Sequence, residues 1–127
     1  MKPQFLVLPY TRFMLLSLIF SPKPQTILHI GLGGGSLVRW LFQEFPNTRQ
    51  TIIEINSDVI EVAYKFFRLP EDNLLRVINA NAIEFVPGIS EKFDLIFLDA
   101  FNDFGPSEEI KGACFLQDLL NCLSNSG

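Results

Sequence analysis

A glycine-rich turn that joins a strand-type segment to a helix-type segment constrains this chain more than any other feature. The apolar run Ile27–Ile30 passes directly into the turn Gly31–Ser36, and an amphipathic run follows at once. Such a turn exposes backbone N–H groups at a helix N-terminus, where they can hold a polar ligand. Glu54 lies 23 residues after Gly31, at the end of a second apolar run, where a carboxylate can accept hydrogen bonds from two ribose hydroxyls. The pattern predicts a binding site for a nucleoside cofactor.

The spacing of the glycines narrows the class of cofactor. The dinucleotide fingerprint G-x-G-x-x-G needs its third small residue at position 36, which is Ser36 here. A dinucleotide turn is built around a pyrophosphate, whereas a sulfonium nucleoside carries an amino-acid or aminopropyl tail that consecutive glycines allow the backbone to approach. The spacing favours S-adenosylmethionine or its decarboxylated form, with NAD or FAD, or a turn without a ligand, as the alternatives. The predicted cofactor-binding glycines are Gly31, Gly33, Gly34 and Gly35.

Segments of strand and helix type alternate along the chain. Strands are expected at Thr26–Ile30, Gln50–Ile55, Leu75–Asn79 and Phe93–Leu98, the last buried on both faces. Helices are expected at Ser36–Phe45, from a cap at Ser57 through Phe67, at Ala82–Phe85 and from about Ser107 to Leu123. Such alternation, with right-handed crossovers, gives a parallel sheet flanked by helices. The predicted fold is a three-layer, Rossmann-like α/β domain with four strands.

The two ends of the chain are expected to differ from this domain. Residues 1–24 are predicted to form a helical lead-in, and residues 25–127 the nucleoside-binding domain. The apolar run Phe5–Phe20 is interrupted and shorter than a membrane span, so no membrane segment is expected. A docking helix from about Pro9 to Phe20 is predicted instead, and association of two copies through it is left open. Asn125–Gly127 has the composition of a turn before a fifth strand, which predicts a C-terminally truncated domain.

Charge and cysteine content argue against several other classes of protein. The net charge of −4 and the pI near 4.9 differ from the basic surface of a nucleic-acid-binding protein. Cys114 and Cys122 are eight residues apart on a predicted helix, too far for a disulfide, and no Cys/His cluster has metal-ligand spacing. Both cysteines are interpreted as small core residues of a reduced, cytoplasmic protein without a metal site. His29 is likewise expected to be a packed core residue, and so are Phe66 and Phe67.

Several motifs, taken in order, resemble those of the spermidine synthase family of aminopropyltransferases. They are Tyr10–Arg12, Ile27–Gly35, Ile52–Asn56, Asn79–Ala82, and Phe93–Asp99 followed by Gly105-Pro106. The resemblance covers the chain from about residue 9 to residue 127. It implies a methyltransferase-like Rossmann sheet and the transfer of an aminopropyl group from decarboxylated S-adenosylmethionine to a polyamine.

The resemblance also implies roles for individual residues in cofactor binding. Glu54 matches the acid that binds the ribose, as the spacing already suggested. Asn81 stands where the family usually has an aspartate that accepts a hydrogen bond from the adenine amino group, although it could equally cap the helix that begins at Ala82. Ala82 would then lie beside the adenine, with Ile55 on the other face of the ring. Asp99, at the carboxyl end of its strand, would begin the loop that lines the reaction site.

Two positions depart from the family pattern where the chemistry occurs. Asn102 occupies the place of the acid that takes the proton from the attacking amine, and an amide cannot act as a base. Asp103, one residue further along, could substitute, so Asp99 and Asp103 are the predicted catalytic residues. Gly34 stands where the family usually has an acid that contacts the amine of the tail.

Three functional hypotheses follow from these residues. The first is a spermidine synthase-like protein that binds S-adenosylmethionine or its decarboxylated form and transfers an aminopropyl group to a polyamine. The second is a methyltransferase that uses the same site on an unknown acceptor, for which Gly34 is an advantage because no acid repels a carboxylate tail. The third is a non-catalytic module that binds a nucleoside or another chain.

Overall fold

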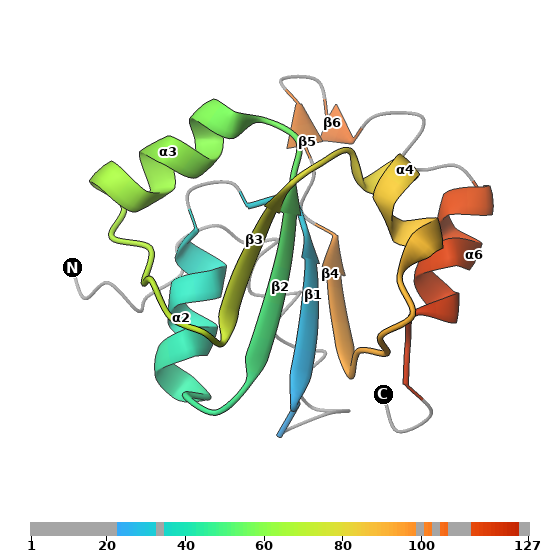
Figure 1. The fold of residues 1–127 in the computed structure, drawn as a ribbon, viewed down its shortest axis with the longest axis horizontal. Helices are drawn as coiled ribbons and strands as arrows, with labels where there is room; N and C mark the ends of the chain where they lie inside the picture. The colour runs from blue at the N-terminus through green and yellow to red at the C-terminus, as the bar shows by residue number, and fades with distance from the viewer. Residues whose placement is uncertain (1–22, 33–34, 99–100, 103–104, 107–112, 125–127) are drawn as a thin grey trace.

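The computed structural model describes residues 23–32, 35–98, 101–102, 105–106 and 113–124. Four parallel strands form the main sheet: β1 (Thr26–Ile30), β2 (Arg49–Glu54), β3 (Leu75–Asn79) and β4 (Leu95–Leu98). Their order across the sheet is β3-β2-β1-β4 (Figure 1), so β1 lies in its interior. All three strand pairs are parallel, which places the carboxyl ends of the strands at one edge of the sheet.

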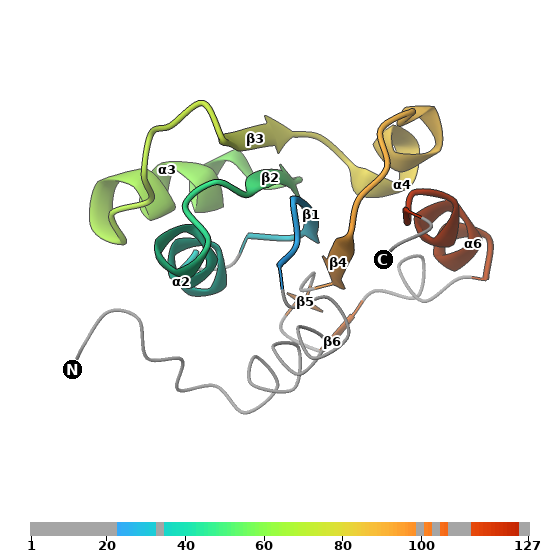
Figure 2. The ribbon, with the colours of Figure 1, turned by 90° about the horizontal axis from the view of Figure 1, so that it is seen from below.

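Helices cover both faces of this sheet. The helices α2 (Ser36–Glu44) and α3 (Ser57–Phe66) lie on one face. The helix α4 (Ala82–Phe85), the short 3₁₀ turn η2 (Val86–Gly88) and the helix α6 (Ala113–Asn121) lie on the other face, and Figure 2 shows the two helical layers on opposite sides of the strands. The predicted three-layer, Rossmann-like fold is confirmed.

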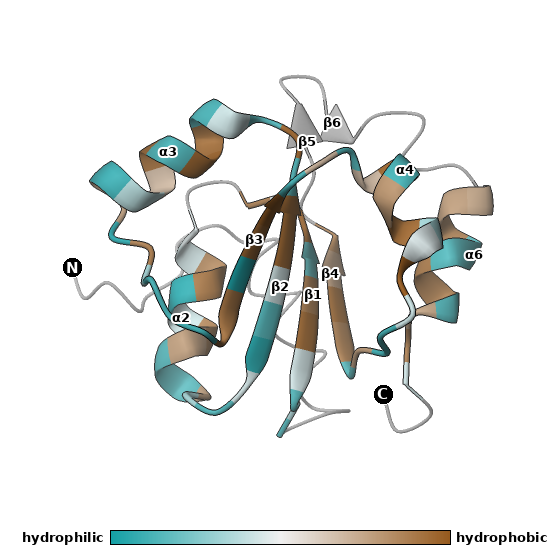
Figure 3. Cartoon of the chain, viewed as in Figure 1, coloured by the Kyte–Doolittle hydropathy of each residue, from teal (hydrophilic) through white to brown (hydrophobic). Residues whose placement is uncertain are grey.

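The alternation of side chains along β1 explains why both faces are apolar. Ile27 packs with Leu37 and Leu41 of α2, whereas Leu28 packs with Phe115 and Leu119 of α6. A third cluster joins α2, α3 and β2 through Leu32, Val38, Ile52, Ala63, Leu69 and Leu75. Figure 3 shows hydrophobic residues along β4, over much of β1 and in the upper half of β2, whereas the lower half of β2 and the middle of β3 are hydrophilic.

The strand and helix positions predicted from the sequence agree with the structure to within a few residues, except that the described part of the last helix begins at Ala113. The cap of α3 is Asn56 rather than Ser57, because the Asn56 side chain accepts a hydrogen bond from the Asp58 N–H at 2.9 Å. The loop after β4 was not expected to contain strands, but it forms a short antiparallel pair, β5 (Phe101–Asn102) and β6 (Gly105–Pro106). Figure 1 shows this pair at the carboxyl end of the sheet.

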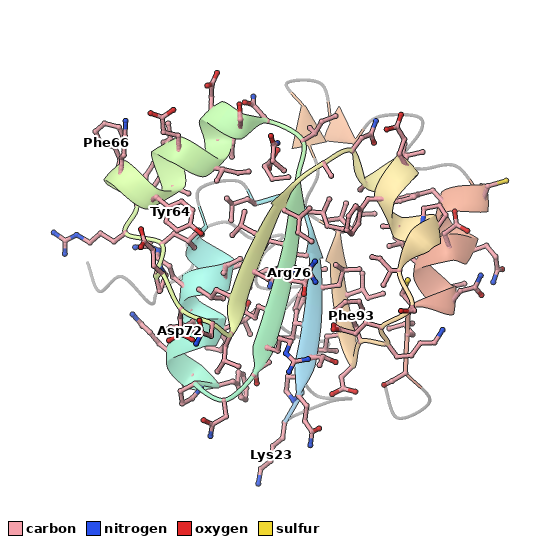
Figure 4. All side chains as sticks on the ribbon, viewed as in Figure 1. Lys23, Tyr64, Phe66, Asp72, Arg76 and Phe93 are labelled. Carbon is pink, nitrogen blue, oxygen red and sulfur yellow. The ribbon has the colours of Figure 1, made fainter. Side chains whose placement is uncertain are left out.

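The prediction that Phe66 and Phe67 are core residues is wrong. Phe66 is 73% exposed and Phe67 is 43% exposed, and Figure 4 shows Phe66 at the end of α3, pointing away from the sheet. The helix packs against the sheet through a stripe that contains Val59, Ala63 and Tyr64, and Phe66 lies to one side of it. The apolar residues of this segment are spaced so closely that the sequence did not show which of them face the sheet.

The prediction for the last strand is also partly wrong. β4 begins at Leu95, and its burial alternates, with Leu95 and Phe97 buried and Ile96 and Leu98 only half-buried. β4 lies at one end of the four-stranded sheet, and the face that carries Ile96 and Leu98 is less covered than the face that carries Leu95 and Phe97. Phe93 lies before the strand and forms an isolated parallel bridge with Leu123, where the chain returns after α6.

The two cysteines differ in their surroundings. Cys122 is buried, as expected, and packs in the cluster beneath α6. Cys114 is exposed, so the prediction that it is a core residue is wrong, because the first turn of α6 buries its neighbour Phe115 instead. Both are free thiols. Among the described residues no helix is long and apolar enough to cross a membrane. The predicted lead-in helix and the turn at Asn125–Gly127 lie outside the described residues.

Candidate functional site

The carboxyl end of β2 carries the acid that the sequence singled out. Glu54 is half-buried, and its Oε1 atom accepts a hydrogen bond from the Leu32 N–H at 2.9 Å. Its Oε2 atom accepts a second one from the Asn56 N–H at 3.0 Å. A carboxylate offers about four acceptor positions. Since the backbone takes one on each oxygen, each oxygen keeps one for a further donor, such as a pair of neighbouring hydroxyl groups.

The glycine turn brings the backbone to this carboxylate. Gly31 and Gly35 both have positive φ angles, 97° and 80°, which residues with a side chain rarely adopt. The Gly31 N–H donates to the Ile53 carbonyl at 2.8 Å, and the Gly35 N–H donates to the Leu32 carbonyl at 3.0 Å. These two bonds fix the chain on either side of Leu32, so that its N–H points to Glu54. Gly33 and Gly34 lie outside the described residues.

Asn79 fixes the end of β2 from the neighbouring strand. Its side-chain Nδ2 donates to the carbonyl oxygens of Glu54 and Ile55, at 2.9 and 3.0 Å. The Ala80 N–H also donates to the Glu54 carbonyl, at 3.1 Å. The sequence indicated a motif at Asn79–Ala82, but it did not predict that the Asn79 side chain would bind the carbonyls at the end of β2. Glu54 and Asn79 are register partners at the ends of the parallel strands β2 and β3, and this register indicates the role of Asn79.

Asn81 caps the helix α4, one of the two roles that the sequence left open. Its Oδ1 accepts a hydrogen bond from the Ile83 N–H at 3.0 Å. The following residue, Ala82, is buried against Ile30 and Ile53, near the carboxyl ends of β1 and β2. Ile55 is 66% exposed although it is a large apolar residue. The structure thus brings Gly31, Gly35, Glu54, Ile55, Asn81 and Ala82 to one end of the sheet.

The other predicted site residues cannot be placed in this arrangement. Asp99 and Asp103 lie outside the described residues, and for Asn102 only the backbone of β5 is described. In the described part of the chain, no group of three or more His, Cys, Asp or Glu side chains could hold a metal ion. The only histidine of the chain, His29, is 1% exposed and lies inside β1, as expected for a core residue.

The helix α2 differs from the two helices that follow it. The N-terminal N–H groups of α3 and α4 receive side-chain caps from Asn56 and Asn81. The N-cap of α2 is Gly35, which has no side chain, and no acidic residue lies in the first turn. Its first N–H groups therefore carry no side-chain partner at the end of the sheet where Glu54 lies, and the helix dipole there favours a negative group.

The family assignment follows from comparison with known proteins. Residues 10–127 match the model of the "Spermine/spermidine synthase domain". The chain belongs to the spermine/spermidine synthase family. Within this family it is 38% identical, over 98% of its length, to the polyamine aminopropyltransferase of Neisseria meningitidis, and 37% identical, over 94%, to that of Vibrio vulnificus. It covers 48% and 41% of these two relatives, and so spans about half of their length or less.

Solved structures give the same fold for this member of the spermine/spermidine synthase family. A probable spermidine synthase from Corynebacterium glutamicum superposes with a TM-score of 0.85 at 18% identity, over 96% of this chain and 46% of that one. Human methyltransferase-like protein 13, solved in complex with SAH, superposes with a TM-score of 0.77 at 25% identity, over 93% of this chain and 59% of that one. The sheet is therefore shared by aminopropyltransferase-like and methyltransferase-like proteins.

Gly35 offers a direct test of the turn. Gly35→Ala is expected to lower the free energy of unfolding by about 1–2 kcal/mol, because alanine must adopt a left-handed backbone at φ 80°. Its Cβ would lie 3.4 Å from Leu69 Cδ1, so crowding adds little. Gly88→Ala is the matched control, since nothing lies within 4 Å of its Cβ. Urea unfolding of both variants measures the difference, and an equal effect at the two positions would contradict the strain argument.

Proposed function

We propose that the chain binds a sulfonium nucleoside, S-adenosylmethionine or its decarboxylated form, at the carboxyl end of its sheet. The observation that carries this proposal is the Glu54 carboxylate, which is held by two backbone N–H groups and keeps one acceptor position on each oxygen. A ribose presents two neighbouring hydroxyl donors, which match this arrangement. The family membership of the chain supports the same ligand class.

The base of the nucleoside would lie between Ile55 and Ala82. The exposed side chain of Ile55 offers an apolar surface next to Glu54, and a purine ring placed on it would remove that surface from water. Asn81 would bind the amino group of the base through Oδ1, which has a second lone pair beside the one that caps α4. Because an amide oxygen carries no charge, this contact is expected to be weaker than that of an aspartate.

We further propose that the complete protein transfers an aminopropyl group from the decarboxylated nucleoside to a polyamine. The polyamine aminopropyltransferases that resemble this chain support the proposal. Asp99 and Asp103, in the loop after β4, would attract the cationic polyamine and take the proton from the amine that attacks the carbon next to the sulfonium. The C–S bond breaks as the new C–N bond forms, and methylthioadenosine leaves.

A second candidate is methyl transfer from S-adenosylmethionine, whose tail keeps its carboxylate. Two features favour it: the N-terminus of α2 has no side-chain cap and no acid in its first turn, and Gly34 stands in place of the acid of the family pattern. A carboxylate could bind the first N–H groups of α2, whereas an aminopropyl tail would meet no acid there. The two candidates therefore differ in the tail that the turn accepts.

Thermal unfolding with four nucleosides tests both candidates. S-adenosylmethionine, its decarboxylated form, methylthioadenosine and NADH are each added at the same concentration, because stabilisation follows affinity by mass action. Methylthioadenosine is expected to raise the Tm by roughly 10 °C at one hundred times its Kd, and NADH to raise it little. A larger shift with the decarboxylated form supports aminopropyl transfer, and a larger shift with S-adenosylmethionine supports methyl transfer.

The absence of any nucleoside binding would overturn the proposal. If none of the four nucleosides shifts the Tm at millimolar concentration, the chain does not bind this ligand class. If nucleosides bind but no aminopropyl transfer to polyamine acceptors is detected, the proposal of aminopropyl transfer fails, and the methyltransferase and the non-catalytic nucleoside-binding module remain.

A further inference from the structure

A buried polar pair lies beneath the glycine turn and has no part in the proposed chemistry. His29 of β1 is 1% exposed and Gln50 of β2 is 0% exposed, in a sheet whose other inward residues are mostly apolar. Buried polar groups destabilise a fold unless they are hydrogen-bonded. The bonds of this pair therefore indicate what it holds in place.

The donor and the acceptor in each hydrogen bond of the pair can be assigned from its partners. Gln50 Nε2 donates to the carbonyl of Val38, in the first turn of α2, at 3.2 Å. Since a carbonyl can only accept, the other end of the amide, Oε1, faces His29 at 2.7 Å, and His29 Nε2 must donate to it. The His29 ring also stacks on Phe97 of β4, with the ring centroids 5.5 Å apart. The pair thus connects β1, β2, β4 and α2.

The same face of β2 reaches both ends of the glycine turn. Gln50, Ile52 and Glu54 alternate along the strand, so their side chains point to one face. Glu54 binds the Leu32 N–H at the start of the turn, and Gln50 binds the Val38 carbonyl after it. Between them, Ile52 packs in one cluster with both Leu32 and Val38. Apolar packing alone is non-directional, whereas the two hydrogen bonds fix how far α2 can slide along β2.

We propose that His29 and Gln50 are positioning residues for the candidate site. They hold the first turn of α2 at the position along β2 that brings the Leu32 N–H within hydrogen-bond distance of the Glu54 carboxylate. The acid then points its remaining acceptor positions away from the sheet. The inference rests on the proposed function for its effect on ligand binding, but its effect on the Leu32 hydrogen bond can be measured without a ligand.

The test replaces both members of the pair. In the double variant His29→Leu with Gln50→Leu, neither side chain leaves an unpaired buried partner, and the Val38 carbonyl remains within its helix. We expect the variant to fold, the Leu32 amide to exchange its hydrogen at least tenfold faster relative to the Ile52 amide in the middle of β2, and methylthioadenosine to bind at least tenfold more weakly. His29→Gln, which keeps a donor for Gln50, should restore both properties to within about twofold of the wild-type chain.

A matched control separates positioning from general stability. Thr48→Val removes a buried hydrogen bond, that of Thr48 Oγ1 to the Pro24 carbonyl, at the opposite end of the sheet. It should lower stability without changing the exchange of Leu32 relative to Ile52. If the double variant fails to fold, comparison of His29→Met with His29→Gln asks the same question with one substitution.

The results distinguish this inference from the proposed function. Unchanged Leu32 exchange in the folded variants overturns the positioning role, whatever the nucleoside affinity. If the wild-type chain binds no nucleoside but Leu32 exchange still depends on the pair, the proposed function fails and the positioning role stands. Faster Leu32 exchange with unchanged nucleoside affinity also overturns the inference, because the Leu32 bond would then not matter to the site.

Discussion

Replacing Glu54 with alanine is expected to weaken nucleoside binding by about two to four orders of magnitude. Each hydrogen bond from a ribose hydroxyl to a carboxylate contributes about 1.5–3 kcal/mol, and the substitution removes two of them. It also leaves the Leu32 N–H, which belongs to a residue only 3% exposed, without its acceptor at 2.9 Å. The turn is therefore expected to loosen as well as lose its ligand contact. Isothermal titration with methylthioadenosine measures the affinity.

Two further variants make this result interpretable. Glu54→Gln keeps the size of the side chain and one acceptor oxygen, so a loss of about tenfold is expected. Glu61→Gln is the control, because Glu61 lies exposed on α3, where it pairs with Lys65, and its replacement removes the same charge away from the site. Affinity should be unchanged in this control. Binding by folded Glu54→Ala within twofold of the wild-type chain would remove Glu54 from the site.

Lowering the pH from 7 to 4 is expected to reduce the free energy of unfolding by about 3 kcal/mol, because His29 is buried in its neutral form. Burial lowers the pKa of His29 from 6.5 to about 4, and its hydrogen bond with Gln50 opposes that shift only partly. Between these two values the unfolded chain binds a proton that the folded chain does not, so stability rises with pH. The contribution is complete above about pH 6.5 and falls by up to about 1.4 kcal/mol per pH unit below it.

Urea unfolding at a series of pH values measures this dependence. His29 is the only histidine of the chain, so no other imidazole contributes. The variant His29→Gln, which cannot titrate, should show a nearly flat profile between pH 5 and pH 6.5, where most carboxylates are still ionised. A profile in that range as steep as that of the wild-type chain would assign the dependence to another group.

The order of elements was predictable because each one has a local signal. The strands at Thr26–Ile30 and Leu75–Asn79 have the predicted bounds, and so does the short helix at Ala82–Phe85. What the sequence could not show is which apolar residues face the sheet. Phe66 and Ala63 are three residues apart, as neighbours on one helix face are, yet only Ala63 is buried, and Phe66 is the last residue of α3.

The candidate site was predictable to a similar degree. Glu54 was found because the end of a strand and a glycine turn stand at a known spacing along the chain. Its partners at Leu32 and Asn56 were not found, since they are backbone N–H groups and have no signature in the side chains. The connection of His29 with Gln50 could not be predicted either, because it depends on the register of β1 against β2.

The backbone character of the contacts to Glu54 has a consequence for how this sequence can change over time. The two donors belong to Leu32 and Asn56, but only through main-chain atoms that every residue except proline possesses. Substitutions at these two positions therefore keep both N–H donors, although they also remove the packing of Leu32 and the Asn56 cap of α3. The donors to the acid therefore depend on the course of the backbone rather than on the chemistry of the two side chains. At Asn102 and Gly34 the side chain itself matters, because each stands where the family pattern has an acid.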